Sequence, residues 1–401
     1  MIKELNKNQL YKNWEVKRLG DVCSFHNGKG HEKSIDENGR YKVVNSKFVS
    51  SNGMKAKRTA IAKFPLLKED IVMVMSDVPN GKTLAKCFYI DKDDEYSLNQ
   101  RVCAFRTTSF DKDFLFYQLN RNKYFLDFNN GENQSNLRKG DILDCPLLIP
   151  PLDQQKQIVA TLDKAFATID TATANAKQNL QNAKEFFESY LQNVFENKGD
   201  DWDRKKLQDV CHKISDGTHQ TPKYFDEGVI FLSSRNVTSG KINWDKIKYI
   251  DEKQHIEMHK HIAPRIDDIL LAKNGTTGVA AIVDRDVVFD IYVSLAHIRS
   301  LGDVYPQFLL YFINSTVAKK QFNSRLKGAG VPNLHLKEIR EVVIDFPNSI
   351  EEQKKIVSKL DTISIETKKL EAIYTKKLAD LEEMKKSVLQ KAFAGQLKTI
   401  N

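Results

Sequence analysis

The chain contains the same sequence pattern twice, and this duplication limits its architecture more than any other feature. Residues 13–23 match residues 201–211 without a gap, at an offset of 188 positions from Trp14 to Trp202. A second pair of blocks, residues 152–159 and 350–357, closes each half at an offset of 198 positions. Since self-similarity at a fixed period indicates repeated structural units, we predict a tandem duplication.

The first part of each repeat shows short apolar runs between clusters of Gly, Asn and Asp. Such runs, when rich in β-branched and aromatic residues, are typical of strands separated by turns. The runs lie at residues 41–44, 71–75, 86–90 and 102–105, and in the second copy at 229–233, 269–272, 279–283 and 287–293. Residues 114–119 and 308–313 have a helical pattern. We therefore predict two mixed α/β domains, without a defined topology.

The second part of each repeat predicts a long helix. In residues 152–197, apolar or small side chains recur at alternating spacings of three and four, with no interior Pro or Gly. The stripe in the C-terminal copy is less regular. The predicted pairing positions are Leu162, Phe166, Ile169, Leu180, Phe187 and Tyr190, with Leu360, Ile363, Leu370, Leu378 and Leu381. Each helix could pack on its own domain, or the two could form an antiparallel coiled coil that separates two α/β domains.

These patterns divide the chain into four segments. The predicted segments are a first domain at 1–151, a central helix at 152–199, a second domain at 200–349 and a C-terminal helix at 350–401.

The net charge of +9, from 62 Lys and Arg against 53 Asp and Glu, is compatible with a polyanionic partner but does not establish one. No run of eighteen apolar residues predicts a membrane helix, and residues 1–14 lack the apolar segment of a signal peptide. The five cysteines form no CxxC pair, so neither a disulfide framework nor a cysteine-based zinc site is predicted. We expect a cytoplasmic protein.

One segment imitates a nucleotide-binding loop. The apolar run 71–75 precedes residues 80–83, which read Asn-Gly-Lys-Thr. However, Ser76 stands where the motif needs its first glycine, and residues 84–90 are typical of another strand. No helix N-terminus would then receive a phosphate, so nucleotide binding is not predicted.

Two further enzyme hypotheses also fail. His255, His259 and His261 suggest a metal, and the first two share a helical face, but no cysteine or HExxH pattern accompanies them. We therefore expect a solvated surface there and no metal. The chain also lacks an Asn-Pro-Pro-Tyr-type adenine-methylation motif, a glycine-rich cofactor loop and a nuclease core.

Several separate motifs resemble one protein family. They are the boundary signatures at 149–158 and 346–356, the C-terminal stretch 388–397, and, in the second domain, residues 216–224 and 268–278. Together with the duplication and the long helices, they resemble the specificity subunit of type I restriction-modification enzymes. The first domain departs from the pattern, with Lys-Gly-His-Glu-Lys-Ser at 29–34 where the second has Gly-Thr-His-Gln-Thr-Pro.

The resemblance implies a DNA-reading scaffold without catalysis of its own. In that family each globular unit is a target recognition domain that reads one half of a bipartite, asymmetric site on double-stranded DNA. The helices act as a spacer and dock two methyltransferase subunits, which modify adenine at N6 with S-adenosylmethionine, and motor-nuclease subunits can join. The resemblance thus implies no cofactor in this chain. A coiled-coil assembly scaffold that binds only proteins is the alternative.

We selected candidate DNA contacts among polar residues in Gly-flanked or loop segments. Arg and Asn side chains can read base edges, while Lys and backbone amides favour phosphate. The second-domain candidates are Thr218, His219, Thr221, Lys223, Tyr224, Arg235, Asn236, Lys273, Asn274, Thr276 and Thr277. The first-domain candidates are His31, Asn45, Lys47, Asn80, Lys82, Gln100 and Arg101.

Overall fold

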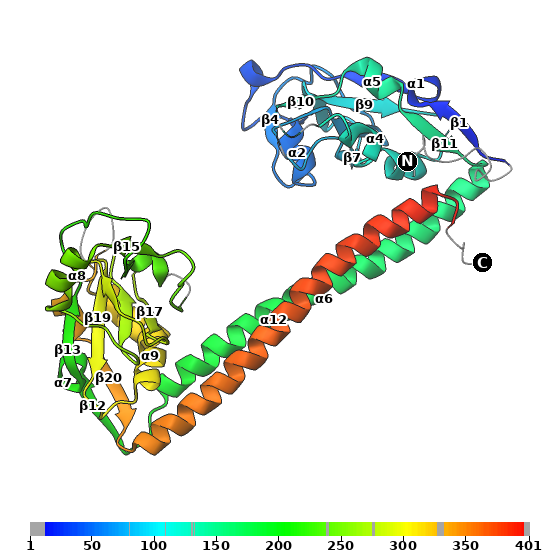
Figure 1. Cartoon of the computed structure of the whole chain (residues 1–401). Helices are drawn as coiled ribbons and strands as arrows, with labels where there is room; N and C mark the ends of the chain where they lie inside the picture. The colour runs from blue at the N-terminus through cyan, green and yellow to red at the C-terminus, as the bar shows by residue number, and fades with distance from the viewer. Residues whose placement is uncertain are drawn as a thin grey trace. The chain divides into compact units, whose positions relative to one another are not determined.

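The computed structural model describes residues 13–79, 81–108, 110–129, 131, 133–237, 240–274, 277–326 and 333–396 (Figure 1). The chain forms two compact units. Unit 1 comprises the described residues of 1–175 and 378–401, and unit 2 comprises those of 176–377. Each unit contains one globular domain and a part of both long helices.

The two globular domains share most of their element order, although among the described residues η3, β6 and β10 occur only in the first and α8 only in the second. The first contains β1 (Glu15–Arg18), α1 (Leu19–Val22), β2 (Ser24–Asn27), η3 (Glu32–Ser34), β3 (Tyr41–Val44), α2 (Ser46–Ser50), β4 (Lys57–Thr59), β5 (Ile71–Val74), β6 (Ser76–Asp77), β7 (Cys87–Tyr89), β8 (Tyr96–Leu98), β9 (Val102–Arg106), α3 (Lys112–Leu119), α4 (Lys123–Leu126), β10 (Ser135–Asn136), α5 (Lys139–Leu143) and β11 (Pro146–Ile149). The second contains β12 (Trp202–Lys206), α7 (Leu207–Val210), β13 (Cys211–Asp216), β14 (Val229–Leu232), η4 (Ser234–Asn236), β15 (Lys248–Ile250), α8 (Glu252–His259), β16 (Ile269–Ala272), β17 (Val279–Ile282), β18 (Phe289–Ile291), β19 (Leu295–Ser300), α9 (Pro306–Asn314), α10 (Thr316–Asn323), α11 (Leu336–Arg340) and β20 (Val343–Pro347).

The sheets repeat from one domain to the other. A four-stranded antiparallel sheet has the order β2-β9-β5-β7 in the first domain and β13-β19-β16-β17 in the second. A three-stranded sheet, β4-β3-β8 or β15-β14-β18, has one antiparallel and one parallel pair. The first and last strands pair antiparallel, as β1-β11 and β12-β20. The predicted mixed α/β class is confirmed, and the structure supplies the topology.

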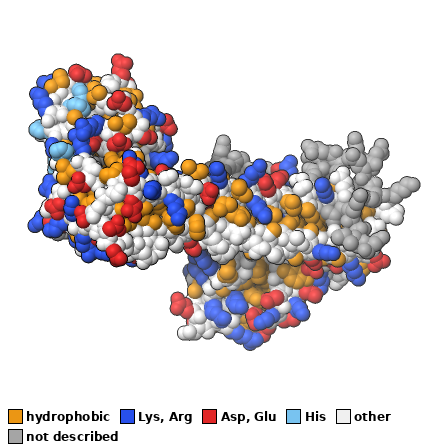
Figure 2. Space-filling model, turned by 90° about the horizontal axis from the view of Figure 1, so that it is seen from below, with side chains coloured by type: hydrophobic (Ala, Val, Ile, Leu, Met, Phe, Trp, Pro, Cys, Tyr) orange, Lys and Arg blue, Asp and Glu red, His pale blue; other side chains and the backbone are white. Residues whose placement is uncertain are grey.

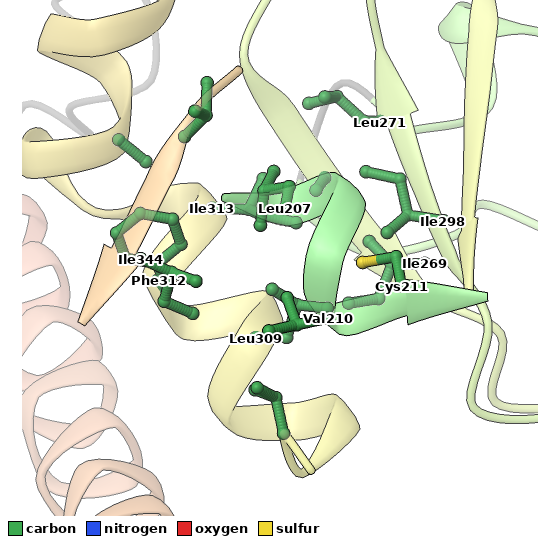
Figure 3. Close-up of a cluster of buried hydrophobic side chains, with 14 of the residues drawn as sticks. Leu207, Val210, Cys211, Ile269, Leu271, Ile298, Leu309, Phe312, Ile313 and Ile344 are labelled. Atoms are coloured by element: carbon green, nitrogen blue, oxygen red, sulfur yellow. The ribbon is translucent and has the colours of Figure 1, made fainter. Parts of the chain in front are cut away.

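The central strand of the four-stranded sheet explains why its sequence is a continuous apolar run. In β16 all four residues are buried. Ile269 and Leu271 face a core cluster that includes residues of α7 and α9 (Figure 3). Leu270 and Ala272 belong to a second cluster with residues of the three-stranded sheet. Since successive side chains of a strand point to opposite faces, a strand covered on both sides must be apolar at every position.

The two long helices are α6 (Leu152–Glu196) and α12 (Ile350–Phe393), as the sequence predicted. A buried glutamine attaches the first turn of each to the domain that precedes it. Gln155 accepts a hydrogen bond from the amide of Asp111 at 2.9 Å and donates to the carbonyl of Pro150. Gln353 repeats this with Tyr305 at 2.7 Å and Pro347. The spacing of the boundary motif, which the two repeats share, therefore positions a helix start.

The C-terminal end of each long helix packs on a globular domain that is not the one preceding the helix. In both cases the helix end and the domain belong to the same unit. In unit 2, Phe195 of α6 contacts Phe308 edge-to-face, with ring centroids 5.2 Å apart. In unit 1, Phe393 of α12 contacts Phe114 in the same manner at 5.6 Å. The four residues occupy equivalent positions of the two repeats, so each unit reproduces the other's helix contact.

The helices also contact each other, and they run antiparallel. Lys385 lies 2.9 Å from the carboxylate of Asp170 and over the ring of Phe166 in unit 1. In unit 2, Lys359 lies over the ring of Tyr190. Higher numbers in α6 thus pair with lower numbers in α12. Both arrangements left open by the sequence occur, since each helix packs on domains and on its partner helix.

Most predicted pairing positions are covered. The buried ones are Leu162, Phe166, Ile169, Leu360 and Leu381, and the half-buried ones are Leu180, Phe187, Tyr190, Ile363 and Leu378. Leu370 is 43% exposed, so its assignment to the seam is wrong. Within the described part of the chain, no helix combines the length and apolar composition needed to cross a bilayer.

Candidate nucleic-acid interface

A glycine positions the same loop in both domains. A Cβ atom at Gly217 would lie 1.9 Å from the carbonyl oxygen of Ile291, and one at Gly28 would lie 1.9 Å from that of Asn99. No other residue permits so close an approach of two backbones. The following residue, Thr218 or Lys29, then bridges to Tyr292 or Asn99. The loop is thereby held against the end of a strand of the three-stranded sheet.

In the second domain this loop presents several of the predicted side chains to solvent. His219 is 75% exposed at its side chain and lies 3.4 Å from Asp216. Thr218 is half-buried, and Thr221 is exposed and lies 3.2 Å from the hydroxyl of Tyr292. The loop is thus ordered by its own contacts while its polar groups remain accessible.

The next residues form an exposed aromatic and basic surface. The backbone of Lys223 is held by Gln254, whose amide accepts at 2.9 Å and donates at 3.0 Å. Its side chain is exposed and lies over the ring of Phe225. Lys248 lies 3.7 Å from the ring centre of exposed Tyr224, a cation–π geometry. Lys248 was missed by the sequence analysis, because the contact joins the first residue of β15 to a loop residue 24 positions earlier.

Two predicted contacts of the second domain are instead buried. The ammonium of Lys273 forms an ion pair with Asp216 at 2.6 Å. Asn236 accepts from the amide of Ser233 and donates to the carbonyls of Asn243 and Lys246. Both side chains are about 5% exposed. Their polar groups therefore fix the loops from which exposed neighbours project.

The remaining candidates of the second domain vary in exposure. Arg235, in η4, is exposed, and Asn274 and Thr277 are half-buried. Asn274 forms a β-bridge with Asn333, and the side-chain oxygens of both are buried. Thr276 lies outside the described residues.

In the first domain, buried groups again support exposed ones. His31 is 1% exposed, with Nε2 lying 2.8 Å from the hydroxyl of Ser97 and Nδ1 lying 3.2 Å from the side-chain oxygen of Asn99. Asn45 caps α2 by accepting from the amide of Phe48. Lys47, in the first turn of that helix, is exposed.

Three other described candidates of the first domain, Lys82, Gln100 and Arg101, are exposed. Gln100 donates to the carboxylate of Glu32. Arg101 has a left-handed backbone, with φ of 66°, in the turn between β8 and β9. Asn80 lies outside the described residues.

The loop at residues 77–84, whose sequence imitates a nucleotide-binding motif, is held by hydrogen bonds to the carboxylate of Asp77. Asp77 accepts hydrogen bonds from the amides of Val78, Thr83 and Leu84, at 2.9, 2.6 and 3.0 Å. Burial raises the pKa of Asp77, but these bonds outweigh it and lower the pKa below its ordinary value. Backbone amides that a phosphate would need are therefore occupied.

A buried ion pair supports the four-stranded sheet in each domain. Arg106 binds Asp70 through two bonds of 2.7 and 2.8 Å, and Arg299 binds Asp268 through two bonds of 2.7 and 2.6 Å. Burial raises the pKa of Asp268, but hydrogen bonds from Arg299 and His297 outweigh it and lower the pKa to about 2. The carboxylate therefore stays ionised at neutral pH.

A histidine pair in the second domain differs from the solvated surface expected from sequence. His255 and His259 project from α8 toward Asp290 of β18, which is 2% exposed. Asp290 also lines a cavity of about 370 Å³ together with Gly217, His219 and His261. Asp290 carried no recognisable signal in the sequence, since its partners lie 31 and 35 residues away.

Charges on the molecular surface are mixed. On the face drawn in Figure 2, Lys and Arg side chains alternate with Asp and Glu, and hydrophobic side chains form a band along the long helices. The candidate interface is therefore a set of polar loops with local basic groups. Such a surface can form hydrogen bonds and phosphate contacts, which are the two elements of DNA recognition.

The chain matches the family model of the type I restriction modification DNA specificity domain twice, at residues 11–182 and 199–379. It is 24% identical to the type I restriction enzyme MjaVIII specificity subunit of Methanocaldococcus jannaschii, over 100% of this chain and 96% of that protein. It is 23% identical to the EcoKI specificity subunit of Escherichia coli, over 90% of this chain and 80% of that one.

Solved structures show the same fold. A chain from a study of assembly and conformational transition of the type I restriction-modification system superimposes with a TM-score of 0.77, at 18% identity, covering 97% of this chain and 99% of that one. The HsdS subunit from Thermoanaerobacter tengcongensis gives 0.61, also at 18% identity, covering 99% and 100%. The repeated fold and the two matches to one family model thus agree that this chain belongs to the type I restriction-modification specificity subunits, with two copies of the specificity domain and no catalytic assignment.

Proposed function

We propose that this chain selects the DNA site of a type I restriction-modification complex. Each globular domain reads one half of a bipartite, asymmetric site on double-stranded DNA. The observation that carries this proposal is the repeated loop at Gly28 and Gly217, which each domain holds rigidly beside exposed polar side chains. Two recognition domains that share one fold but differ in their exposed side chains account for two different half-sites.

The exposed and buried candidates have different roles in this proposal. Arg235 and His219 contact base edges, whereas Lys223 and Lys47 contact phosphates. Buried Lys273, Asn236 and His31 act as positioning residues, since their polar groups are already bonded to the protein. Exposed Tyr224 offers an aromatic face at the edge of the surface.

The long helices provide the docking surface for partner proteins. Apolar side chains remain exposed on α12 at Ile365, Ile373 and Met384, by 55%, 57% and 52%, and on α6 at Phe186, by 57%. Such exposed groups on a helix pair fit protein interfaces. We assign them to two adenine-N6 methyltransferase subunits, which carry S-adenosylmethionine, while motor-nuclease subunits join in the restriction complex.

A domain exchange tests the proposal directly. Replacing residues 200–349 with the corresponding domain of a relative should change one half-site and leave the other half and the spacer unchanged. Long-read sequencing of adenine methylation in the host, with the methyltransferase present, measures this. If both half-sites changed together, the two domains would not read independently. If the chain supported no sequence-specific methylation, it would act as a scaffold for proteins only.

Single substitutions refine the test. Arg235→Ala should relax discrimination at one base position, at a cost of roughly 1–3 kcal/mol for a lost bidentate contact. Arg204→Ala is a matched control, because Arg204 is an exposed arginine of the same domain that pairs with Asp345 in the β12–β20 sheet. It should leave the methylated sequence unchanged. Equal effects of both variants would remove Arg235 from the reading surface.

A further inference from the structure

Three potential metal ligands converge in the second domain. Nδ1 of His255 lies 2.7 Å from Oδ2 of Asp290, and Nδ1 of His259 lies 3.1 Å from Oδ1 of the same carboxylate. The two imidazole rings have centroids 4.6 Å apart. One ligand atom of each residue lies within 4.8 Å of the others. The cluster therefore contains two nitrogen donors and one carboxylate at the contact between α8 and β18.

The secondary structure places these donors without strain. His255 and His259 are four positions apart in α8 (Glu252–His259), so both project from one face of the helix. Asp290 is the middle residue of β18, which pairs parallel with β14, and all three residues of β18 are buried. A helix and a strand thus present the ligands from opposite sides.

The burial of Asp290 is the second observation that favours a cation. Its side chain is 2% exposed, while those of His255 and His259 are 14% and 30% exposed. An ionised carboxylate in such a place needs a positive partner, because desolvating an uncompensated charge is costly. Among the described residues, only the two histidines lie within ion-pairing distance of Asp290. A divalent cation bound by the histidine nitrogens would compensate it.

We propose that His255, His259 and Asp290 bind a divalent transition-metal ion, for which Zn²⁺ is the appropriate probe. Zinc prefers imidazole nitrogen and carboxylate oxygen at about 2.0–2.2 Å, which places neighbouring ligands of a tetrahedron about 3.3 Å apart. The nitrogen–oxygen distances of 2.7 and 3.1 Å require only a small opening to accept the ion. Water completes the coordination, since His259 lies partly open to solvent.

The duplication supplies an internal comparison. In the parallel strand pair, Asp290 faces Phe231, and the equivalent pair of the first domain matches Ser97 with Val43. Ser97 lies against His31 rather than against a pair of histidines. No helix is described between β4 and β5 at the position corresponding to α8. The proposed site is therefore a feature of the second domain alone.

The bound ion fixes α8 against the sheet beside the predicted reading loop. Asp290 lines the same cavity of about 370 Å³ as Thr218, His219 and Gln220. Gln254, also in α8, holds the backbone of Lys223. Ordering α8 would consequently order the segment from Thr218 to Lys223. The metal has a structural role here, and its binding does not depend on DNA recognition.

Metal binding to the full-length chain tests the proposal. Protein treated with EDTA is dialysed against Zn²⁺, passed through a desalting column and analysed for zinc by mass spectrometry. We expect one Zn²⁺ per chain, and Co²⁺ in its place should give the visible absorption of a low-coordinate site. The double variant His255→Gln/His259→Gln should retain at least tenfold less zinc. Glutamine keeps side-chain volume and a hydrogen-bond donor to Asp290.

A matched control removes two histidines outside the cluster. His212→Gln/His335→Gln loses two exposed imidazoles of the same domain and should bind zinc like the wild type. Hydrogen exchange of the wild type supplies a readout without substitutions, and Zn²⁺ should slow exchange in residues 252–259. Absence of retained zinc in the wild type, equal retention by the two double variants, or unchanged exchange in α8 would each overturn the proposal.

Discussion

The aromatic contacts at the helix ends allow a quantitative test of the repeated architecture. Phe195 is 5% exposed and makes edge-to-face contacts with Phe308 at 5.2 Å and Phe312 at 5.5 Å. Truncating a buried phenylalanine to alanine costs about 3–5 kcal/mol, of which each aromatic pair contributes about 0.5–1.5 kcal/mol. We expect Phe195→Ala to lie near the upper end of that range, because two aromatic pairs are lost.

The equivalent variant in unit 1, Phe393→Ala, should also lower the free energy of unfolding, but by less than Phe195→Ala. Phe393 is 7% exposed and has one such pair, with Phe114 at 5.6 Å, near the end of α12. We expect Phe393→Ala to cost about 3 kcal/mol. Phe186→Ala is the control, since Phe186 is 57% exposed and its removal should change stability by no more than about 0.5 kcal/mol.

Denaturant unfolding monitored by hydrogen exchange measures the effect separately for each unit. Phe195→Ala should accelerate exchange in α9 of unit 2, and Phe393→Ala should accelerate it in α3 of unit 1. The reasoning is refuted if either variant costs less than about 1 kcal/mol, or if Phe195→Ala loosens α3 instead of α9.

Three other predictions concern charge and backbone. The pKa of Asp268 falls from 3.8 to about 2 on folding, so its ion pair stabilises unit 2 fully above pH of about 4 and loses that contribution as the pH falls toward 2. The free energy of unfolding, measured against pH, should therefore decrease by roughly 2 kcal/mol in acid, and Asp268→Asn should abolish this decrease. An unchanged acid profile in the variant would contradict the prediction. The logarithm of the DNA affinity should fall linearly with the logarithm of the salt concentration. Lys223→Ala should make this slope shallower by about one and leave the preferred sequence unchanged. A salt-independent affinity would count against phosphate contacts. Gly217→Ala should weaken discrimination of one half-site only, since its Cβ would collide with the carbonyl of Ile291; unchanged methylation at both half-sites would show that the loop does not read DNA.

The candidate site was only partly predictable. Exposed Lys223 lies on a loop as expected, because Gly, Pro and polar clusters mark loops locally. Exposed Arg235 lies instead in the short helix η4. Lys273, Asn236 and His31 were selected for the same reason but are buried. Lys273 and His31 are bonded to groups 57 and 68 residues away, and no local pattern indicates such partners. Asn236 is bonded within its own loop, to groups no more than 10 residues away.

The amino-acid sequence by itself determined the duplication, the two long helices, eight of the twenty strands described and the family. These features depend on local periodicity and on matching positions within one chain, which are visible without coordinates. The tertiary structure decided the sheet order, the attachment of each helix through Gln155 and Gln353, and the meeting of His255, His259 and Asp290. Those features join residues distant in sequence, so they exist only once the backbone pairs and the side chains are buried together.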